Sequence, residues 1–190
     1  MIRLFIALKI DEEIQNKFDT IISDFKTKGG KVKWIDSKNL HITLKFLGNT
    51  EPKLIDTIIS QIQYSVGTLK PFESDFSALG GFPNLRKPKV IWANIAKHRN
   101  NIIELAENIN HSLAELNIEK HDKPFQPHLT LGRVKSYESL TELTDYLSSY
   151  QFEKIDITCN TIQLIKSTLT QHGPIYKTLQ EINLTEKFGD

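Results

Sequence analysis

The sequence is short of the residues and patterns that mark several classes of protein. Its only cysteine, Cys159, excludes an intramolecular disulfide framework and a cysteine-rich zinc site. Nine glycines and seven prolines in 190 residues are too few for a collagen-like or low-complexity chain. The apolar run near the N-terminus, Leu4 to Leu8, is too short for a signal-peptide core, and no stretch is long enough to span a membrane. We therefore expect a cytoplasmic protein.

An excess of charge of one sign is also lacking. Lysine and arginine number 24 against 23 acidic residues, which gives a net charge of +1. A protein that grips a long phosphate backbone usually has a basic excess, whereas recognition of a single terminal phosphate needs none. With 39% hydrophobic and 25% charged residues, the chain is expected to fold as a globular protein.

The spacing of hydrophobic residues predicts a mixture of strands and helices. Their order does not follow strict βαβ alternation, which favours an α+β fold. No linker interrupts the chain, so residues 1–190 are predicted to form a single domain. Strands are predicted at 2–10, 32–35, 40–47, 72–79, 89–96, 128–134, 155–168 and 175–184, and helices from the cap Asp11 to Gly29, from Pro52 through Ile62, and over 99–116 and 137–149.

One tetrapeptide pattern occurs twice, as His41-Ile42-Thr43-Leu44 and His128-Leu129-Thr130-Leu131. Successive side chains of a strand point to opposite faces, so the His and Thr of each copy share one face, about 6.5 Å apart. The aliphatic residues of the first copy, together with Phe46, are expected on the other, buried face. Each strand would then present an imidazole and a hydroxyl to a cleft or to solvent.

Two imidazoles that face each other suit phosphodiester chemistry. Neutral histidine takes a proton from water and histidinium gives one to a leaving alkoxide, and both states are accessible near pH 7. Thr43 and Thr130 can donate hydrogen bonds to nonbridging phosphate oxygens, and Arg133 can clamp the same phosphate. Strict alternation places Arg133 on the face opposite His128, and we expect a bulge at Gly132 to turn it back.

Metal binding is a competing use of histidine. A zinc site usually has three or four ligands with supporting carboxylates, and neither copy has an acidic residue two or four positions from its histidine. No metal and no cofactor are therefore predicted. The remaining histidines are expected to be solvent-exposed at His98, His111 and His121, and to lie in a turn at His172.

Basic and aromatic residues offer a second, weaker signal. The basic residues of 85–89 and of 26–33 are typical of a solvated surface, and alternatively of a track for the few phosphates behind an RNA end. Three aromatic residues flank these segments and could either pack in the core or stack a base: Trp34, Phe82 and Phe125.

The segments around both tetrapeptides resemble those of a known family. Leu40–Gly48 and Phe125–Arg133 are similar to the two HxTx motifs of the RNA 2′,3′-cyclic phosphodiesterases, also called 2′-5′ RNA ligases, within the 2H phosphoesterase superfamily. The similarity extends over nearly the whole chain and includes Arg3–Leu8, Pro88–Ala93 and Gly173–Tyr176.

The resemblance implies a bilobal α+β fold, with two antiparallel sheets lining a central cleft and helices packed outside. It implies metal-independent hydrolysis of an RNA terminal 2′,3′-cyclic phosphate to a 2′-phosphomonoester. By the same resemblance, His41 is the proton donor, His128 is the proton acceptor, and Thr43, Thr130 and Arg133 hold the phosphate. The expected partner is RNA with such an end; no membrane and no obligate protein partner are expected, and a monomer is predicted.

Three alternatives stay open at this point. The same cleft chemistry serves 2′-5′ ligation of RNA, or hydrolysis of another small cyclic phosphodiester. A non-catalytic module that binds RNA ends is a third possibility, but it would not need paired histidines.

Overall fold

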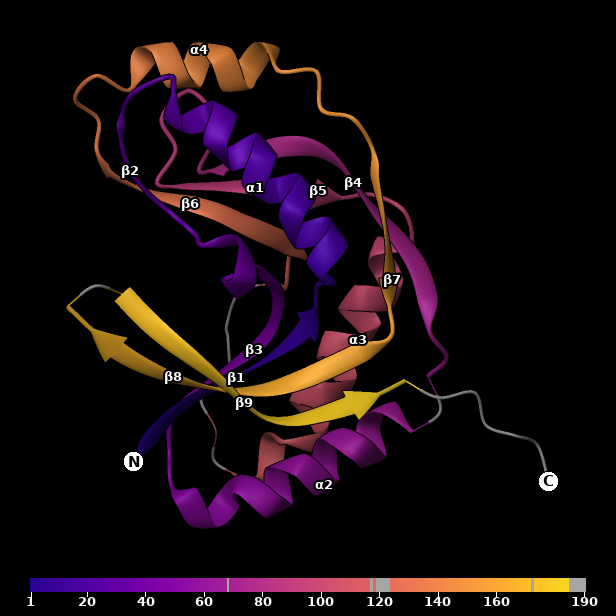
Figure 1. Ribbon diagram of the computed structural model, residues 1–190. Coiled ribbons are helices and arrows are strands. Elements are labelled where there is room, and N and C mark those ends of the chain that lie inside the picture. Colours follow the sequence, from indigo (N-terminus) through magenta and orange to yellow (C-terminus); the bar gives the residue numbers. More distant parts are fainter. Residues whose placement is uncertain (68, 117, 119–123, 172, 185–190) are drawn as a thin grey trace.

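The computed structural model describes residues 1–67, 69–116, 118, 124–171 and 173–184, and within these ranges it contains two antiparallel sheets (Figure 1). The four-stranded sheet has the order β3-β1-β8-β9 and the five-stranded sheet the order β2-β6-β5-β4-β7. The strands are β1 (Ile2–Lys9), β2 (Lys31–Trp34), β3 (His41–Thr50), β4 (Phe72–Phe82), β5 (Val90–Ile95), β6 (His128–Ser136), β7 (Ile155–Cys159), β8 (Thr161–Thr170) and β9 (Gly173–Asn183).

Helices cover the outer side of each sheet, as Figure 1 shows: α1 and α4 lie over the five-stranded sheet, and α2 and α3 lie under the four-stranded one. They are α1 (Glu12–Lys26), α2 (Ile55–Val66), α3 (Arg99–Ser112) and α4 (Thr141–Ser149), with short 3-10 turns η1 (Ser37–Asn39), η2 (Pro52–Leu54) and η3 (Ala114–Leu116). No helix in the described ranges combines the length and the apolar composition needed to cross a bilayer.

The helices form because their apolar residues recur at helical spacing and find a sheet to cover. In α1, Phe18 and Phe25 belong to a buried stripe. Phe18 packs edge-on against Phe76 of β4, with ring centroids 5.1 Å apart, and Phe25 packs against Trp34 of β2 at 5.9 Å. This packing fixes α1 against the five-stranded sheet.

One hydrophobic cluster continues from one sheet to the other. It includes Leu4 and Ile6 of the four-stranded sheet and Ile91 and Ile95 of the five-stranded sheet, all fully buried. A shared core of this kind supports our proposal that residues 1–190 form one bilobal domain.

The predicted strand over 155–168 is in fact two strands in different sheets. Residues Ile155, Ile157 and Cys159 alternate in burial and pair through β7 with β4, whereas β8 pairs with β1. The alternation breaks after Asn160, where Thr161 and Ile162 are buried in succession. The chain crosses between the two sheets at this break, so a single continuous strand was the wrong prediction.

Two further boundaries differ from prediction. Gly80 to Phe82, which lie beyond the predicted end of the strand at residue 79, extend β4, since a glycine without a side chain lets the Trp92 ring lie directly on Gly80. The predicted third helix ends as α3 at Ser112 and continues only as the turn η3.

Candidate active site

The two tetrapeptides lie on neighbouring strands where the two sheets meet. His41 begins β3, the edge strand of the four-stranded sheet, and His128 begins β6, an inner strand of the five-stranded sheet. The strands β3 and β6 are in contact in the middle of the molecule (Figure 1). Each sheet therefore contributes one His-x-Thr strand to the same place.

Both imidazoles are oriented in the same way. Nδ1 of His41 lies 2.7 Å from the carbonyl oxygen of Asn39, and Nδ1 of His128 lies 2.7 Å from that of Gln126. A carbonyl oxygen only accepts, so each ring donates from Nδ1. In the neutral state this leaves the lone pair on Nε2, which is then the atom available for proton transfer.

Aromatic rings enclose both histidines. Ring centroids of Phe5 and Tyr176 lie 4.8 and 5.5 Å from that of His41, and those of Phe82 and Trp92 lie 5.2 and 6.0 Å from that of His128. Both imidazoles are half-buried among these rings, a setting that disfavours a positive charge.

The enclosure changes the acidity of both rings. Burial lowers the pKa of His41 from its ordinary 6.5 to about 4, although the bond to the Asn39 carbonyl opposes this. The pKa of His128 is also lowered, chiefly by burial and further by the charge of Arg133. Both histidines are thus mainly neutral at pH 7 without substrate, and an anion placed against either one would raise its pKa.

A β-bulge in β6 sets the direction of Arg133. Across the ladder, His128 pairs with Asn94, Thr130 with Trp92, and Arg133 with Val90. Asn94, Trp92 and Val90 share one face of β5, so His128, Thr130 and Arg133 share one face of β6. The unpaired extra residue is Leu131, one position before the predicted Gly132. The expected bulge therefore exists and returns Arg133 to the face of His128.

The same bulge occurs in β3 and moves Phe46. Thr43 pairs with Ala7 and Lys45 with Ile6, so Leu44 is the unpaired residue. Phe46 then pairs with Phe5 and shares the face of His41, where its side chain is 45% exposed. The prediction that Phe46 points into the core was wrong, because strict alternation was applied across a bulge.

Phe46 is the residue that sequence reasoning missed. It stands at the same offset from its histidine as Arg133 does, and comparison of the two copies beyond the tetrapeptide would have revealed this. Lys45, which the bulge turns inward, is 3% exposed and donates from Nζ to Oδ1 of Asn110 in α3, at 2.5 Å.

Three hydrogen-bond donors on this surface are not engaged. Within the part of the chain that the structure describes, the hydroxyls of Thr43 and Thr130 form no hydrogen bond and Arg133 forms no ion pair. Thr43 and Thr130 are half-buried and Arg133 is exposed. Such donors beside two imidazoles suit an anion with several oxygen atoms.

Tyr176 of β9 lies near cations from both sheets. Burial raises its pKa, whereas the charges of Arg133 and Arg3 lower it. The phenol therefore lies within electrostatic reach of a cation from each sheet.

The predicted stacking residues are mostly elsewhere. Trp34 packs against Phe25 of α1, and Phe125 packs against the hydrophobic core. Phe82 does lie at the site, stacked on Trp92 with ring centroids 5.0 Å apart and edge-on to His128.

The basic segments predicted as a possible track for RNA phosphates also lie mostly away from the two histidines. Lys87 lies over the Tyr137 ring and Lys28 over Tyr146, and Lys31 pairs with Glu138. Lys33 differs from these, because it pairs across the β2–β6 ladder with Arg133 and so shares its face.

The remaining histidines stand apart from the site. His98 and His111 are exposed, as predicted, whereas His121 and His172 lie outside the described residues. Among the residues described, no three His, Cys, Asp or Glu side chains gather in a way that could hold a metal ion.

Comparison with known proteins identifies the family to which this chain belongs. A sequence profile of the 2′-5′ RNA ligase superfamily matches residues 11–171, and the chain belongs to that family. It is 34% identical to the RNA 2′,3′-cyclic phosphodiesterase of Methanocaldococcus jannaschii over 180 residues, 94% of this chain and 99% of that protein. It is 36% identical to the protein of the same name from Archaeoglobus fulgidus over 182 residues, 94% of this chain and 98% of that one.

Solved structures confirm the predicted fold. TT0787 of Thermus thermophilus superposes with a TM-score of 0.80 at 25% identity, covering 97% of this chain and 99% of its own. E. coli LigT in complex with 3′-AMP superposes with a TM-score of 0.77 at 20% identity and the same coverage. The α+β architecture with two antiparallel sheets is thus the fold of the 2H phosphoesterases.

Proposed function

We propose that this protein hydrolyses the 2′,3′-cyclic phosphate at the end of an RNA to a 2′-phosphomonoester, without a metal ion. The observation that carries the proposal is the matched pair of imidazoles, each oriented by a 2.7 Å bond from Nδ1, on contacting strands of two different sheets. The names of the relatives from M. jannaschii and A. fulgidus support the same activity.

The reaction is an in-line displacement at phosphorus. Nε2 of His128 takes a proton from water as the water oxygen bonds to phosphorus. The bond between phosphorus and O3′ breaks, and protonated His41 gives its proton from Nε2 to the departing O3′. Solvent then takes the proton from His128 and returns one to His41, so the site is restored.

The phosphate oxygens need donors throughout this step. Thr43, Thr130 and Arg133 share the surface of the histidines and are proposed to bind the nonbridging oxygens. Arg133 adds a fixed positive charge that stabilises the extra negative charge of the five-coordinate transition state.

The division of roles between the histidines follows the family resemblance and one feature of charge. The cation of Arg133 lies beside His128 and disfavours its protonation, which suits a base. The pKa of His41 is lowered to about 4, and burial is the only cause that lowers it. An anionic phosphodiester against the ring offsets that effect and allows His41 to carry the proton.

The position of the leaving oxygen, O3′, also determines where the end of the RNA lies. Because O3′ must lie at His41, the terminal ribose lies over the four-stranded sheet. The exposed aromatic residue on that face is Phe46, which is suited to stack the terminal base.

A second activity, 2′-5′ ligation, is favoured by the family to which the chain belongs. In this case the 5′-hydroxyl of a second RNA replaces water as the nucleophile, and O3′ leaves as before. The product is a 2′-5′ phosphodiester, formed by the same acid and base.

The test is incubation of a short RNA ending in a 2′,3′-cyclic phosphate, with EDTA present, followed by identification of the oxygen that keeps the phosphate. We expect a 2′-phosphate at an unchanged rate with or without EDTA. A 3′-phosphate would contradict the assignment of the leaving oxygen, and loss of turnover in EDTA would contradict metal independence. A parallel reaction with a 5′-hydroxyl RNA detects ligation.

We also propose that the protein is cytoplasmic. We further propose that it is a monomer, because both histidines and all three phosphate donors come from one chain. Light scattering on the purified protein measures the mass, and a dimer at micromolar concentration would contradict the proposal.

A further inference from the structure

A cavity lies beside His41 on the face of the four-stranded sheet that carries the histidine. Its volume is about 240 Å³. His41 lines it, and Phe46 does not. Polar residues from β1, α1, η1, β8 and β9 surround it, among them Lys9, Glu12, Gln15, Lys38, Gln163 and Thr178.

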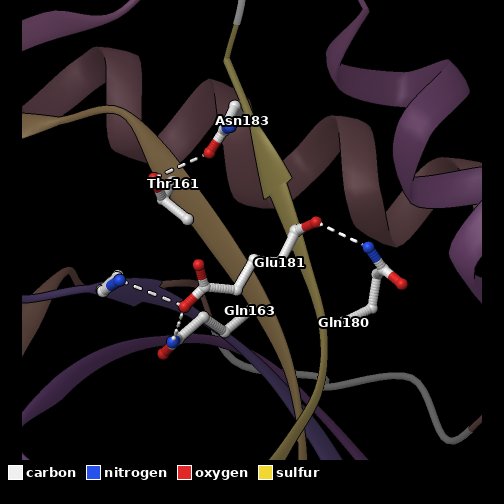
Figure 2. A network of polar contacts seen from close by, with 6 residues as sticks. Thr161, Gln163, Gln180, Glu181 and Asn183 are labelled. Carbon is white, nitrogen blue, oxygen red and sulfur yellow. Dashed lines mark hydrogen bonds and ion pairs between the residues drawn. The ribbon is translucent and has the colours of Figure 1, made fainter.

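Lys9 and Gln163, the sheet residues that form the floor of the cavity, are held by a polar network (Figure 2). Oε1 of Glu181 accepts from Nζ of Lys9 at 3.1 Å and from Nε2 of Gln163 at 2.7 Å. The Gln180 amide donates to the carbonyl oxygen of Glu181 at 2.8 Å, and Thr161 donates to Asn183 at 3.0 Å. The floor residues therefore have set positions before any ligand enters.

This network also determines what the floor can bind. The charge of Lys9 is compensated by Glu181, so the floor offers hydrogen bonds rather than net charge. Figure 2 shows the amide oxygen of Gln163 turned away from Glu181, and it accepts no hydrogen bond from any residue that the structure describes. An uncharged, hydrogen-bonding floor suits sugar hydroxyls and the edge of a base better than a phosphate.

The rim of the cavity carries no excess of positive charge either. Lys38 has a side chain that is 76% exposed, and its Nζ pairs with Asp36 at 3.4 Å. Because Glu12 also lines the cavity, rim and floor alike suit the uncharged parts of a nucleotide better than its phosphate.

The proposed reaction indicates which nucleoside of the RNA occupies the cavity. O3′ of the terminal ribose lies at His41, and its base lies at Phe46, farther along β3. The 5′ side of that ribose, to which the rest of the RNA is attached, can then turn toward the opposite side of His41. That side holds the cavity.

We propose that the cavity binds the sugar or the base of the penultimate nucleoside, the one attached to the 5′ side of the terminal ribose, as a single strand. The inference rests on the proposed function, because it uses the position of the leaving oxygen. The volume is below the roughly 300–1,000 Å³ of pockets that enclose whole drug-sized ligands, so one sugar or one base fills it. The enzyme thus distinguishes a chain end from a free cyclic mononucleotide.

The experiment compares two substrates, adenosine 2′,3′-cyclic phosphate and the dinucleotide ApA with a 2′,3′-cyclic phosphate. We expect kcat/KM to be about tenfold or more higher for the dinucleotide. Equal values for the two substrates would overturn the inference while leaving the proposed function intact. Absence of turnover with both would overturn the proposed function, and this inference with it.

Two variants test the location. Thr178→Trp places a large ring in the cavity, and Gln163→Leu removes the acceptor on the floor. Each is expected to bring the ratio of the two kcat/KM values down toward one, with the mononucleotide rate serving as the internal check of folding. The matched control is Lys177→Trp, which places the same ring on the opposite face of β9. A ratio that Thr178→Trp leaves unchanged would show that the second nucleoside binds elsewhere.

Discussion

At the scale of single residues, His41 and His128 are oriented by backbone carbonyls rather than by side chains. A side-chain acceptor could be lost by mutation or could titrate, whereas a carbonyl oxygen two residues earlier in the chain does neither. The direction of each Nε2 is therefore set by the local backbone. Replacement of the ring itself is the change that removes its function.

We expect His41→Ala and His128→Ala each to lower kcat by about 10²–10⁴-fold, the usual contribution of one positioned acid or base. The measurement is steady-state hydrolysis of an RNA ending in a 2′,3′-cyclic phosphate. The matched control is His111→Ala, which removes an exposed histidine of α3 and should leave the rate unchanged. Undiminished turnover in either motif variant would rule out the proposed proton transfers.

The dependence of rate on pH follows from the two lowered pKa values. The reaction needs protonated His41, whose pKa is about 4, and neutral His128, whose pKa is below its ordinary 6.5. Between these values the loss of protonated His41 with rising pH is offset by the gain of neutral His128. We expect kcat/KM to be flat there, to fall below pH 4, and to fall about tenfold per unit above the upper pKa.

The profile of kcat should differ, since it reports the enzyme with substrate bound. The anionic phosphodiester raises the pKa of both histidines, so the optimum of kcat should lie at higher pH than that of kcat/KM. A kcat/KM that keeps rising from pH 7 to pH 9 would be inconsistent with His41 as the acid.

At the scale of elements, the two bulges limit how far along β3 and β6 the faces of side chains could be predicted from the sequence. Period-2 alternation correctly placed His41 with Thr43 and His128 with Thr130, because no bulge separates the members of either pair. It also correctly placed Leu44 and Leu131 on the buried face, but it failed beyond them. Leu44 and Leu131 are extra residues in their ladders, and nothing in an isolated leucine signals this.

The glycine after the second copy did give a usable signal. Gly132 is buried against β2, and a Cβ there would lie 2.8 Å from both Val32 and Trp34. It suggested a bulge and so the correct face for Arg133. Lys45 occupies the equivalent position in the first copy. Because no glycine signalled a bulge there, Phe46 was predicted on the wrong face of the strand. The crossing at Asn160 was missed for a related reason, because the break in alternation that follows this residue was included in one continuous strand.

Gly80 of β4 supports the second histidine through Trp92. A Cβ at this position would overlap Cζ2 and Cη2 of Trp92, whose ring stacks on Phe82 beside His128. We expect Gly80→Ala to lower the free energy of unfolding by about 1–3 kcal/mol, as overpacking does, and to lower kcat by displacing the rings around His128. Urea denaturation and steady-state rates measure the two effects.

A second variant separates overlap from other effects of the added methyl group. Trp92→Phe removes the fused ring that the methyl would meet. The double variant should therefore lose less stability than the sum of the two single variants. Additive losses would mean that the Trp92 contact is not what makes Gly80 necessary.

At the scale of the whole molecule, the site depends on how the two sheets are held together. Neither sheet contains both histidines, so the chemistry needs a fixed distance between β3 and β6. The hydrophobic cluster that runs through both sheets supplies this, with Leu4 and Ile6 on one side and Ile91 and Ile95 on the other. A protein built of two independent lobes would let the distance vary.

This shared core predicts one cooperative unfolding transition. Both tryptophans, Trp34 in β2 and Trp92 in β5, lie in the five-stranded sheet, so tryptophan fluorescence reports on that sheet alone. Far-ultraviolet circular dichroism reports on both sheets and all helices. Because opening one sheet exposes core residues of the other, the two signals should give the same midpoint in urea. A fluorescence midpoint clearly below that from circular dichroism would mean that the five-stranded sheet unfolds first, and residues 1–190 would then be two domains with an adjustable cleft.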